Sequence, residues 1–460
     1  MTVLASSLSP GVLAATVLGA CAAIAVLVYV MRRHEQAFPL LAILALPFRL
    51  PISADGRTVN LLIPLYLVVA AGVLAHLLPR LLRREEAGFG WLEWVLLASV
   101  VLYAMQALYS SDRAKAAENL AFFYVPFGLL FVLLRDVRWT RELLLRCLAL
   151  AVALAVAFAG VGFVEYARKE LFLNPKVVAA NQFDNYFRVN SLFFDPNIYG
   201  RFLALVMIAV TAFVLWRRNL REVLIAAGVL VWLLAGLVTS FSQSSIAALL
   251  LGLAVLAAYR WDVRRTLYVA AALVVLALAV VLAAPASLHF GLKGNGGSTS
   301  NATSGRTKLI EGGLELFAKR PLEGYGSGSF QTEYQKHSKT SAENATSASH
   351  TIPITVAAEQ GVIGLALYVA LLVLAFVVLF RGAGRSSPRP KPGDARPVLA
   401  SPFRPALGAC FAALVLHTFT YADFLEDPLT WTLLGIGLAL ASTEQGEDPR
   451  AQARVADAMV

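Results

Sequence analysis

The chain is dominated by apolar segments that are long enough to cross a lipid bilayer. A transmembrane helix needs about 20 mostly apolar residues, because it rises about 1.5 Å per residue across a hydrocarbon core about 30 Å thick. The sequence contains thirteen candidate segments, of which the proline-rich second is the weakest. We therefore predict an all-α polytopic membrane protein with 12–13 transmembrane helices. The predicted spans are 11–31, 38–51, 59–78, 91–109, 120–134, 143–164, 198–216, 223–239, 246–259, 267–284, 352–380, 405–420 and 429–441.

The composition agrees with a chain that buries its apolar surface in lipid. Hydrophobic residues make up 58% of the chain, charged residues 15%, and the mean hydropathy is +0.68. The first apolar segment has no basic region before it, so we expect it to remain as a transmembrane helix and not to be removed as a signal peptide. Cys21, Cys147 and Cys410 all fall inside predicted spans, which supports neither a disulfide nor a cysteine-based metal site.

Basic residues recur at every second connection between the predicted spans. Short cytoplasmic connections are enriched in Lys and Arg, so this alternation sets the orientation and accounts for most of the net charge of +10. We predict no nucleic-acid partner, because the positive charges are scattered over short loops. The basic connections carry Arg32 and Arg33; Arg80, Arg83 and Arg84; Arg135, Arg138 and Arg141; Arg217, Arg218 and Arg221; Arg260, Arg264 and Arg265; and the stretch 381–396. The outward connections are then 54–58, 110–119, 165–197, 240–245, 285–350 and 421–428.

Two of the outward connections are long, and they organise the chain. We predict an N-terminal transmembrane bundle at 1–284 that includes the outer loop 165–197, a large outer loop at 285–350, C-terminal transmembrane helices at 351–443, and a cytoplasmic tail at 444–460. Within the large loop, an amphipathic helix is expected from Ser304 until Pro321 ends it. Its apolar face is predicted to contain Leu309, Ile310, Gly313, Leu314 and Phe317.

The end of the first long loop concentrates polar residues in the sequence RVNSLFFDPNIYGR at 188–201. Positive charge held on the outer side runs against the topological preference, which favours a separate role for these side chains over simple solvation. Asp195-Pro196-Asn197 is also a good helix start, and capping of the next span alone could explain it.

Four motifs in a fixed order resemble a known family. RVNSLFFDPN (188–197), GRTKLIEGGLELFAKRPLEGYGSGSF (305–330), His350 and EQGVIGLALYV (359–369) are together similar to the signature of the O-antigen ligase and polymerase superfamily. The resemblance extends over about residues 185–380. Two positions depart from the family pattern: Gln243 stands at an expected arginine, and Thr351 replaces the asparagine that follows the histidine.

The resemblance implies glycan transfer at the outer face of the bacterial inner membrane, which is the periplasmic side. The implied donor is a glycan on undecaprenyl diphosphate, the implied acceptor is a hydroxyl on lipid A-core or on another lipid-linked repeat, and the implied fold is a GT-C-like glycosyltransferase embedded among membrane lipids. By the same resemblance no metal or other cofactor is needed. The chain contains no Asp-x-Asp sequence, and arginines can replace a divalent ion at a diphosphate.

The resemblance also assigns roles to individual residues. A guanidinium can bind phosphate oxygens bidentately, so Arg188 and Arg306 are predicted to stabilise the departing diphosphate. His350 is predicted to act as general base, since an imidazole titrates near neutral pH; capping of the following helix is its alternative role. Further candidates at the diphosphate are Arg201, Lys319, Arg320 and Gln243, and supporting positions are Asp195, Asn197, Tyr325 and Glu359.

Several functions remain open at the level of sequence. A ligase, a polymerase and a transferase acting on a protein hydroxyl all need the same donor site and differ in the acceptor. A transporter or flippase for a lipid-linked sugar would also explain many helices and outward arginines. Transporters, however, commonly have repeated halves and a site near the bilayer midplane, whereas this chain gathers its polar residues in one asymmetric outer loop.

Overall fold

The protein is an all-α, multi-pass membrane protein. A computed structural model describes residues 10–54, 57–84, 88–173, 187–217, 219–261, 268, 299–338, 351–381, 402–419, 421 and 423–446. Within these residues, eight helical segments are long and apolar enough to cross a membrane, and three shorter apolar helices accompany them. Of the predicted span 267–284 the structure describes residue 268 alone, and the tail that follows residue 446 lies outside the described residues.

The N-terminal elements largely follow the apolar segments of the sequence. α8 continues for 28 residues, which is longer than a bilayer requires. The elements are α1 (Pro10–Arg33), α2 (Ala37–Ala45), β1 (Leu50–Ala54), β2 (Arg57–Leu61), α3 (Ile63–Gly72), η1 (Val73–Leu77), α4 (Leu78–Leu82), α5 (Trp91–Ala107), α6 (Arg113–Asn119), η2 (Leu120–Tyr124), α7 (Val125–Arg135) and α8 (Arg141–Arg168).

The remaining elements contain the outer helices of the large loop and the C-terminal spans. The helix predicted between Ser304 and Pro321 is confirmed as part of α14, which ends two residues before the proline. The elements are α10 (Pro196–Leu215), α11 (Leu220–Thr239), α12 (Gln243–Arg260), α14 (Thr299–Lys319), α15 (Phe330–Ser338), α16 (Ile352–Phe380), α17 (Phe403–Thr418) and α18 (Pro428–Gly446).

The second predicted span, 38–51, was wrong. This segment contains the nine-residue helix α2, which is too short to cross a bilayer, and the first residues of an antiparallel hairpin. Pro47 cannot donate the backbone hydrogen bond that would continue the helix. The hairpin pairs Leu50 with Leu61 and Ala54 with Arg57, so the next span begins at Ile63 and not at residue 59.

Two spans contain a π-helical turn directly before a proline. The turn Val73–Leu77 precedes Pro79, and the turn Leu120–Tyr124 precedes Pro126. Proline has no N–H and its ring crowds the carbonyl one turn earlier, so the backbone widens locally and the helix then continues. Each span therefore consists of consecutive helical pieces: α3, η1 and α4 in one, and α6, η2 and α7 in the other.

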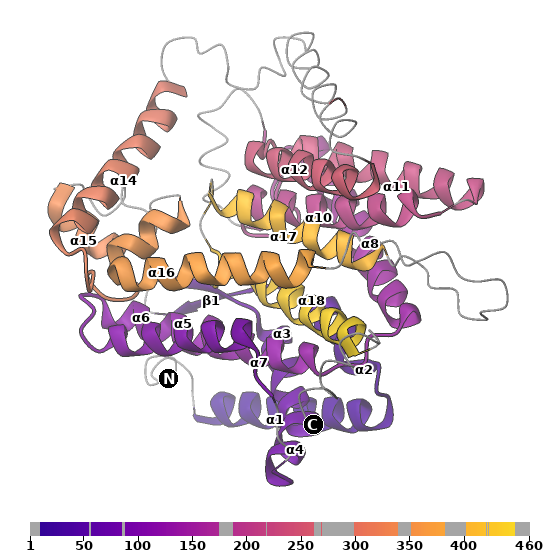
Figure 1. The fold of residues 1–460 in the computed structure, drawn as a ribbon, viewed down its shortest axis with the longest axis horizontal. Coiled ribbons are helices and arrows are strands. Elements are labelled where there is room, and N and C mark those ends of the chain that lie inside the picture. The colour runs from indigo at the N-terminus through magenta and orange to yellow at the C-terminus, as the bar shows by residue number, and fades with distance from the viewer. Residues whose placement is uncertain are drawn as a thin grey trace, which may run out of the picture.

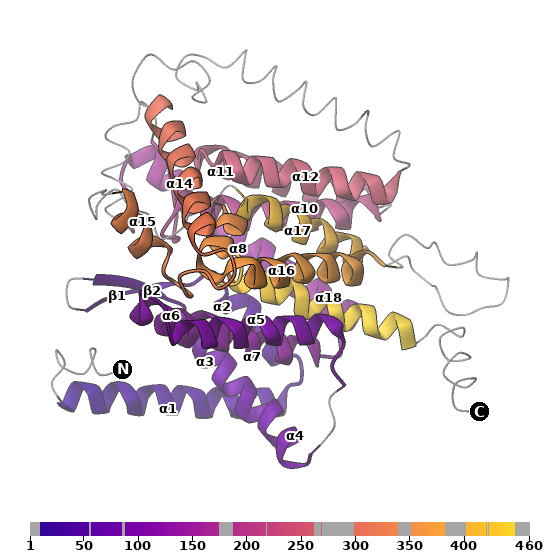
Figure 2. The same cartoon turned by 60° about the vertical axis from the view of Figure 1, so that its left-hand side comes forward.

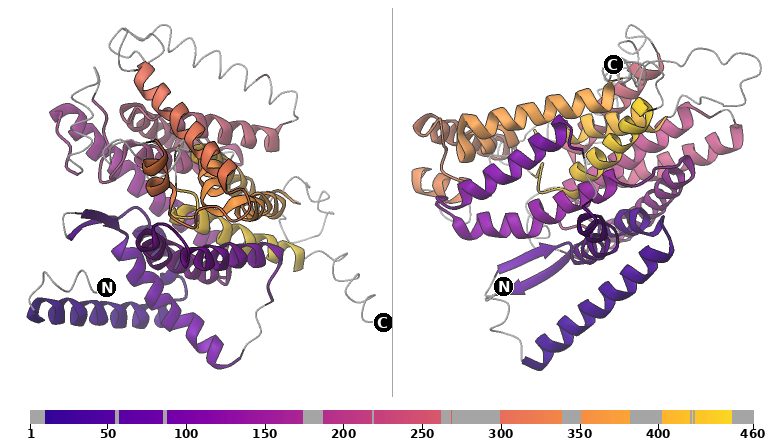
Figure 3. Two further views of the ribbon diagram at one scale, coloured as in Figure 1. Left: turned by 90° about the vertical axis from the view of Figure 1, so that its left-hand side faces the viewer. Right: turned by 60° about the horizontal axis from the view of Figure 1, so that its bottom comes forward.

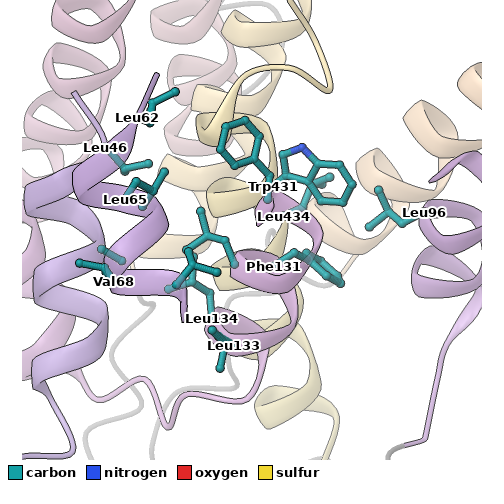
Figure 4. Close-up of a cluster of buried hydrophobic side chains, with 14 of the residues drawn as sticks. Leu46, Leu62, Leu65, Val68, Leu96, Phe131, Leu133, Leu134, Trp431 and Leu434 are labelled. Atoms are coloured by element: carbon teal, nitrogen blue, oxygen red, sulfur yellow. The ribbon is translucent and has the colours of Figure 1, made fainter. Parts of the chain in front are cut away.

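The helices form two packed groups that meet at α17. In one group, α7 and α18 pack around Trp431, which is 1% exposed, together with Phe131, Leu134 and Leu434 (Figure 4). In the other, α10 lies against α8, α11, α12 and α17 (Figure 1). α10 is the most enclosed span, whereas α1 lies at the edge of the bundle and exposes most of its side chains (Figure 3). The exposed apolar surface is the expected property of a bundle whose solvent is lipid.

The outward connections predicted from charge gather at one end of the bundle. Ser110 donates to the carbonyl of Ser327 and Asn119 donates to Glu426, so the connection 110–119 contacts both 285–350 and 421–428. Arg188 donates to the carbonyl of Ser240, so the connection 165–197 contacts 240–245. Figure 2 shows the hairpin, α6, α15 and the start of α16 at this end. At the opposite end, Arg80 pairs with Asp136. We call these the polar end and the basic end.

α16 is interrupted near the polar end. Gly361 has φ 66° and ψ −164° inside an otherwise helical span. The turn that follows α14 supplies the missing hydrogen bonds: Val362 N–H donates to the carbonyl of Pro321 at 2.7 Å, and Gly326 N–H donates to the carbonyl of Glu359 at 2.8 Å. Broken backbone inside a membrane protein is tolerated where protein groups satisfy it. The outer loop is therefore an integral part of this span.

The close contact between α16 and the turn predicts a strong effect of Gly361→Ala. A Cβ at this position would lie 2.1 Å from the carbonyl oxygen of Leu322, and its φ and ψ, which are essentially restricted to glycine, add a backbone penalty of about 1–3 kcal/mol. We expect a lower unfolding temperature in detergent, measured by intrinsic fluorescence during heating. Gly228→Ala is the control, because a Cβ there meets nothing within 4 Å. Equal unfolding temperatures for the two variants would contradict the interlocked arrangement.

Candidate functional site

The segment that carries Arg188 is fixed by a buried carboxylate. Glu165, near the end of α8, is fully buried and accepts hydrogen bonds from the backbone N–H of Ser191 at 2.7 Å and of Asn190 at 3.3 Å. The backbone N–H of Val189 donates to the carbonyl of Thr239 at the end of α11. The chain on both sides of Arg188 is thus held in place before α10 begins.

Asn197 connects this segment to the start of α12. Its side-chain oxygen accepts from Arg188 Nη2 at 3.3 Å and from the hydroxyl of Ser242 at 2.9 Å. Arg188 Nε donates to the carbonyl of Ser240 at 3.2 Å. Asp195 caps α10, as the sequence predicted, by accepting from the N–H of Asn197 at 2.6 Å. We call Arg188, Asn197, Ser240, Ser242 and their hydroxyl neighbours Ser244 and Ser245 the arginine cluster.

His417 completes the arginine cluster from α17. Its ring is fully buried, and Nε2 lies 3.2 Å from the hydroxyl oxygens of both Ser244 and Ser245. Gly200 permits this close packing of α10 against α12, because a Cβ there would lie 2.8 Å from the Ser245 hydroxyl. Sequence reasoning missed His417. The only signal for it is its place in the last turn of a span that leads into the polar connection 421–428.

Arg201 lies one turn further into the bundle and pairs with Asp427. The two side chains are 1% and 2% exposed, and Arg201 Nη2 lies 2.5 Å from a carboxylate oxygen of Asp427. A buried ion pair of this kind links α10 to the start of α18, and removing one partner would leave a buried charge uncompensated. The predicted contact of Arg201 with a diphosphate stays a prediction, and its pairing with Asp427 is a structural role that the sequence did not indicate.

Glu359 binds the glycine-rich turn from the opposite side of the polar end. Its carboxylate accepts from the backbone N–H of Gly328 at 2.8 Å and of Phe330 at 3.0 Å. Gly324 and Gly326 have φ of 67° and 92°, and a Cβ at either would lie within 2.4 Å of backbone atoms. Only glycine fits both the positive φ and the close approach of neighbouring backbone, which explains the spacing of glycines in GYGSGSF. The supporting role predicted for Glu359 thus has a geometric basis, namely orientation of this turn.

Tyr325 and Arg320 belong to the same turn. Tyr325 is buried, its N–H donates to the carbonyl of Ala358, and the guanidinium of Arg320 lies 4.7 Å from the centre of its ring. Arg320 and Lys319 are both exposed, and no contact among the described residues joins them to the arginine cluster. On α14 the side that packs on the protein contains Leu309, Gly313 and Leu316, whereas Leu314 of the predicted apolar face is 50% exposed.

The remaining predicted residues are placed only in part. His350 lies outside the described residues. Arg306 lies in α14, although its side chain is also outside the described part of the structure. Gln243 is exposed at the first position of α12, next to Ser242 of the arginine cluster. The described part of the chain therefore brings Arg188, Asp195 and Asn197 together, and places Tyr325 and Glu359 in a second group.

The connection between α17 and α18 carries two carboxyl groups whose pKa is raised. Burial raises the pKa of Glu426 to about 8, and the nearby carboxylate of Asp423 adds to the rise. Burial also raises the pKa of Asp423, against the opposing effect of the positive charges of Arg201 and Arg49. Asn119 Nδ2 donates to Glu426 Oε1 at 2.8 Å. In the described residues, no group of three or more metal-ligating side chains has the geometry of an ion site.

Comparison with known proteins agrees with the resemblance seen in the sequence. Residues 228–369 match the family model described as O-antigen ligase, and this match supports the predicted resemblance to the O-antigen ligase superfamily. This range begins in α11 and includes α12, the described part of the large loop and the first half of α16. No curated protein matches the chain. The family match indicates a glycosyltransferase-like enzyme with glycan and lipid-linked substrates in general.

The raised pKa of Glu426 predicts a pH dependence of stability. The folded carboxyl has a pKa of about 8 and the unfolded one about 4.3, so between these values the folded state binds more protons. Stability is therefore lost as pH rises through this window, by up to about 2 kcal/mol between pH 6.5 and 8.5. We expect Glu426→Gln, which cannot ionise, to lose less stability than the unmodified protein over this range, measured by thermal unfolding in detergent. Glu118→Gln is the control, and equal pH dependence in all three proteins would contradict the assignment.

Proposed function

We propose that the chain transfers an undecaprenyl-diphosphate-linked glycan to a hydroxyl of the lipid A-core sugar, at the periplasmic face of the bacterial inner membrane. The arginine cluster is the observation that carries this proposal. At the polar end the guanidinium of Arg188, which belongs to the motif RVNSLFFDPN, and the hydroxyl of Ser244 are partly exposed. They lie beside the buried hydroxyl groups of Ser242 and Ser245 and the buried imidazole of His417. Such a set of donors suits a diphosphate.

The position of Arg188 favours stabilisation of a leaving group. Its guanidinium is oriented by Asn197 and by the carbonyl of Ser240, and these partners are themselves fixed by helix ends. An oriented cation costs little reorganisation when negative charge grows on the departing diphosphate. Arg306, in the family's second motif, is assigned the same role from the polar loop.

The proposed reaction is a single metal-independent displacement. The acceptor hydroxyl oxygen forms a bond to the anomeric carbon of the glycan, and the bond from that carbon to the diphosphate oxygen breaks. The electron pair of the broken bond stays on undecaprenyl diphosphate, and the hydroxyl proton passes to His350 as general base. Attack opposite to the leaving group inverts the anomeric configuration.

Alternative enzymes with the same reaction and the same donor differ in the identity of the acceptor. A polymerase would extend another lipid-linked repeat, and a protein O-oligosaccharyltransferase would modify a serine or threonine hydroxyl, both with the same donor. A transporter or flippase is favoured less. Transporters use broken helices to bind substrate, whereas the backbone groups at the break in α16 are bonded by Pro321 and Gly326 of the chain's own turn.

Substitution of Arg188 tests the proposed role. With purified protein, undecaprenyl-diphosphate glycan and lipid A-core, we expect Arg188→Ala to lower kcat by about 100-fold or more, because a charged donor to the leaving group is lost. Arg188→Lys should retain part of the rate, since lysine keeps the charge and lacks the bidentate fork. Gels of the product measure the rate, and turnover should persist in EDTA.

The control is Arg146→Ala at the basic end, where Arg146 is exposed and bonded to Gln36 and Glu142. It should keep activity within about twofold of the unmodified protein, as expected for a surface position. His350→Ala and Arg306→Ala are expected to abolish transfer. Lengthened donor chains in place of modified lipid A-core would make the protein a polymerase. Full activity in Arg188→Ala would exclude the proposed diphosphate site.

A further inference from the structure

A second polar cavity lies apart from the arginine cluster. It has a volume of about 120 Å³ and is enclosed by α5, α6, η2, the first part of α16, the glycine-rich turn and the connection before α18. Glu359, Asp423 and Glu426 line it, whereas Arg188, Asn197 and His417 do not. The cavity is therefore separate from the proposed diphosphate site, although both lie at the polar end.

The charge of the cavity wall is unsuited to a phosphate. Among its described lining residues, three carry carboxyl groups and Lys115 is the one cation. Lys115 Nζ is already paired with a carboxylate oxygen of Glu118 at 3.0 Å. Among the described lining residues no further cation is left to compensate the charge of a diphosphate, so the diphosphate of the donor would be disfavoured here. A ligand with hydroxyl groups and no negative charge is the better match.

The side chain of Asn119, in the cavity wall, has a buried hydrogen-bond acceptor that is not satisfied by any described residue. Asn119 is 3% exposed, and its Nδ2 donates to Glu426 Oε1 at 2.8 Å and to the hydroxyl oxygen of Tyr103 at 2.9 Å. Its Oδ1 is buried and accepts no hydrogen bond from any described residue. A buried acceptor without a partner is costly unless a bound group satisfies it. A sugar hydroxyl, which both donates and accepts, can bond to this oxygen and to the adjacent carboxyl.

We infer that this cavity binds the saccharide end of the acceptor, with Asn119 and Glu426 as its hydrogen-bonding residues. The inference rests on the proposed function and assigns the acceptor to a place distinct from that of the donor diphosphate. Ile352 lines the cavity and follows His350 by two residues in the chain. The proposed general base is therefore close in sequence to a residue of the proposed acceptor site. Glu359 joins the cavity wall to the glycine-rich turn.

The test separates acceptor from donor affinity. Steady-state transfer is measured with undecaprenyl-diphosphate glycan and lipid A-core for Asn119→Ala and for Ser99→Leu, which fills the cavity wall without removing a charged group. Each should raise the KM for the acceptor by about tenfold, as expected for about 1.4 kcal/mol of lost binding, and leave the KM for the donor within about twofold. Glu142→Gln, an exposed position at the basic end and outside the cavity lining, is the control and should change neither KM.

Direct binding makes the test independent of turnover. Radiolabelled core oligosaccharide free of lipid A, and lipid-free repeat-unit oligosaccharide, are titrated into the purified protein by equilibrium dialysis. Binding of the first supports a core acceptor, binding of the second a polymerase acceptor, and either should be lost in Ser99→Leu and kept in Glu142→Gln. The inference is overturned if neither saccharide binds, or if both cavity variants bind them as the unmodified protein does. Failure of transfer with intact saccharide binding would instead count against the proposed function alone.

Discussion

The polar end depends on the contact between the carboxylate of Glu359 and the backbone of the glycine-rich turn. A membrane span normally satisfies its own backbone groups, and α16 departs from this at Gly361. The turn from Pro321 to Phe330 supplies the bonds that the break leaves unmade, and Glu359 fixes the turn through two N–H groups. The described part of the large loop, 299–338, and the transmembrane bundle are consequently one structural unit, and a loop so fixed can position groups for chemistry.

This arrangement places two polar sites of different composition at the polar end. The arginine cluster is formed by α10, α11, α12 and α17, and contains Arg188 with hydroxyl groups. The second polar cavity is formed by α5, α6, η2, α16, the glycine-rich turn and the connection before α18, and contains Asn119, Glu359 and Glu426. A reaction that joins an anionic lipid-linked donor to a hydroxyl-bearing acceptor benefits from two such places, because one supplies a cation for the diphosphate and the other supplies hydrogen-bonding groups for hydroxyls.

Features that follow from local sequence were predictable, and features that depend on distant partners were not. The spans and the grouping of outward connections follow from apolar length and from arginine placement, and the cap at Asp195 follows from a short motif. His417, the pairing of Arg201 with Asp427 and the break at Gly361 each need a partner far along the chain. The hairpin was misassigned because an apolar segment interrupted by prolines satisfies both a span and a strand.

The location of the donor diphosphate decides whether the arginine cluster is the donor site. A cryo-EM structure of the purified protein with a non-transferable undecaprenyl-diphosphate glycan analogue would show it. We expect phosphate oxygens within hydrogen-bonding distance of Arg188 and the hydroxyl groups around Asn197, with the second polar cavity free of phosphate. A diphosphate bound between Glu359 and Glu426, away from Arg188, would contradict this assignment.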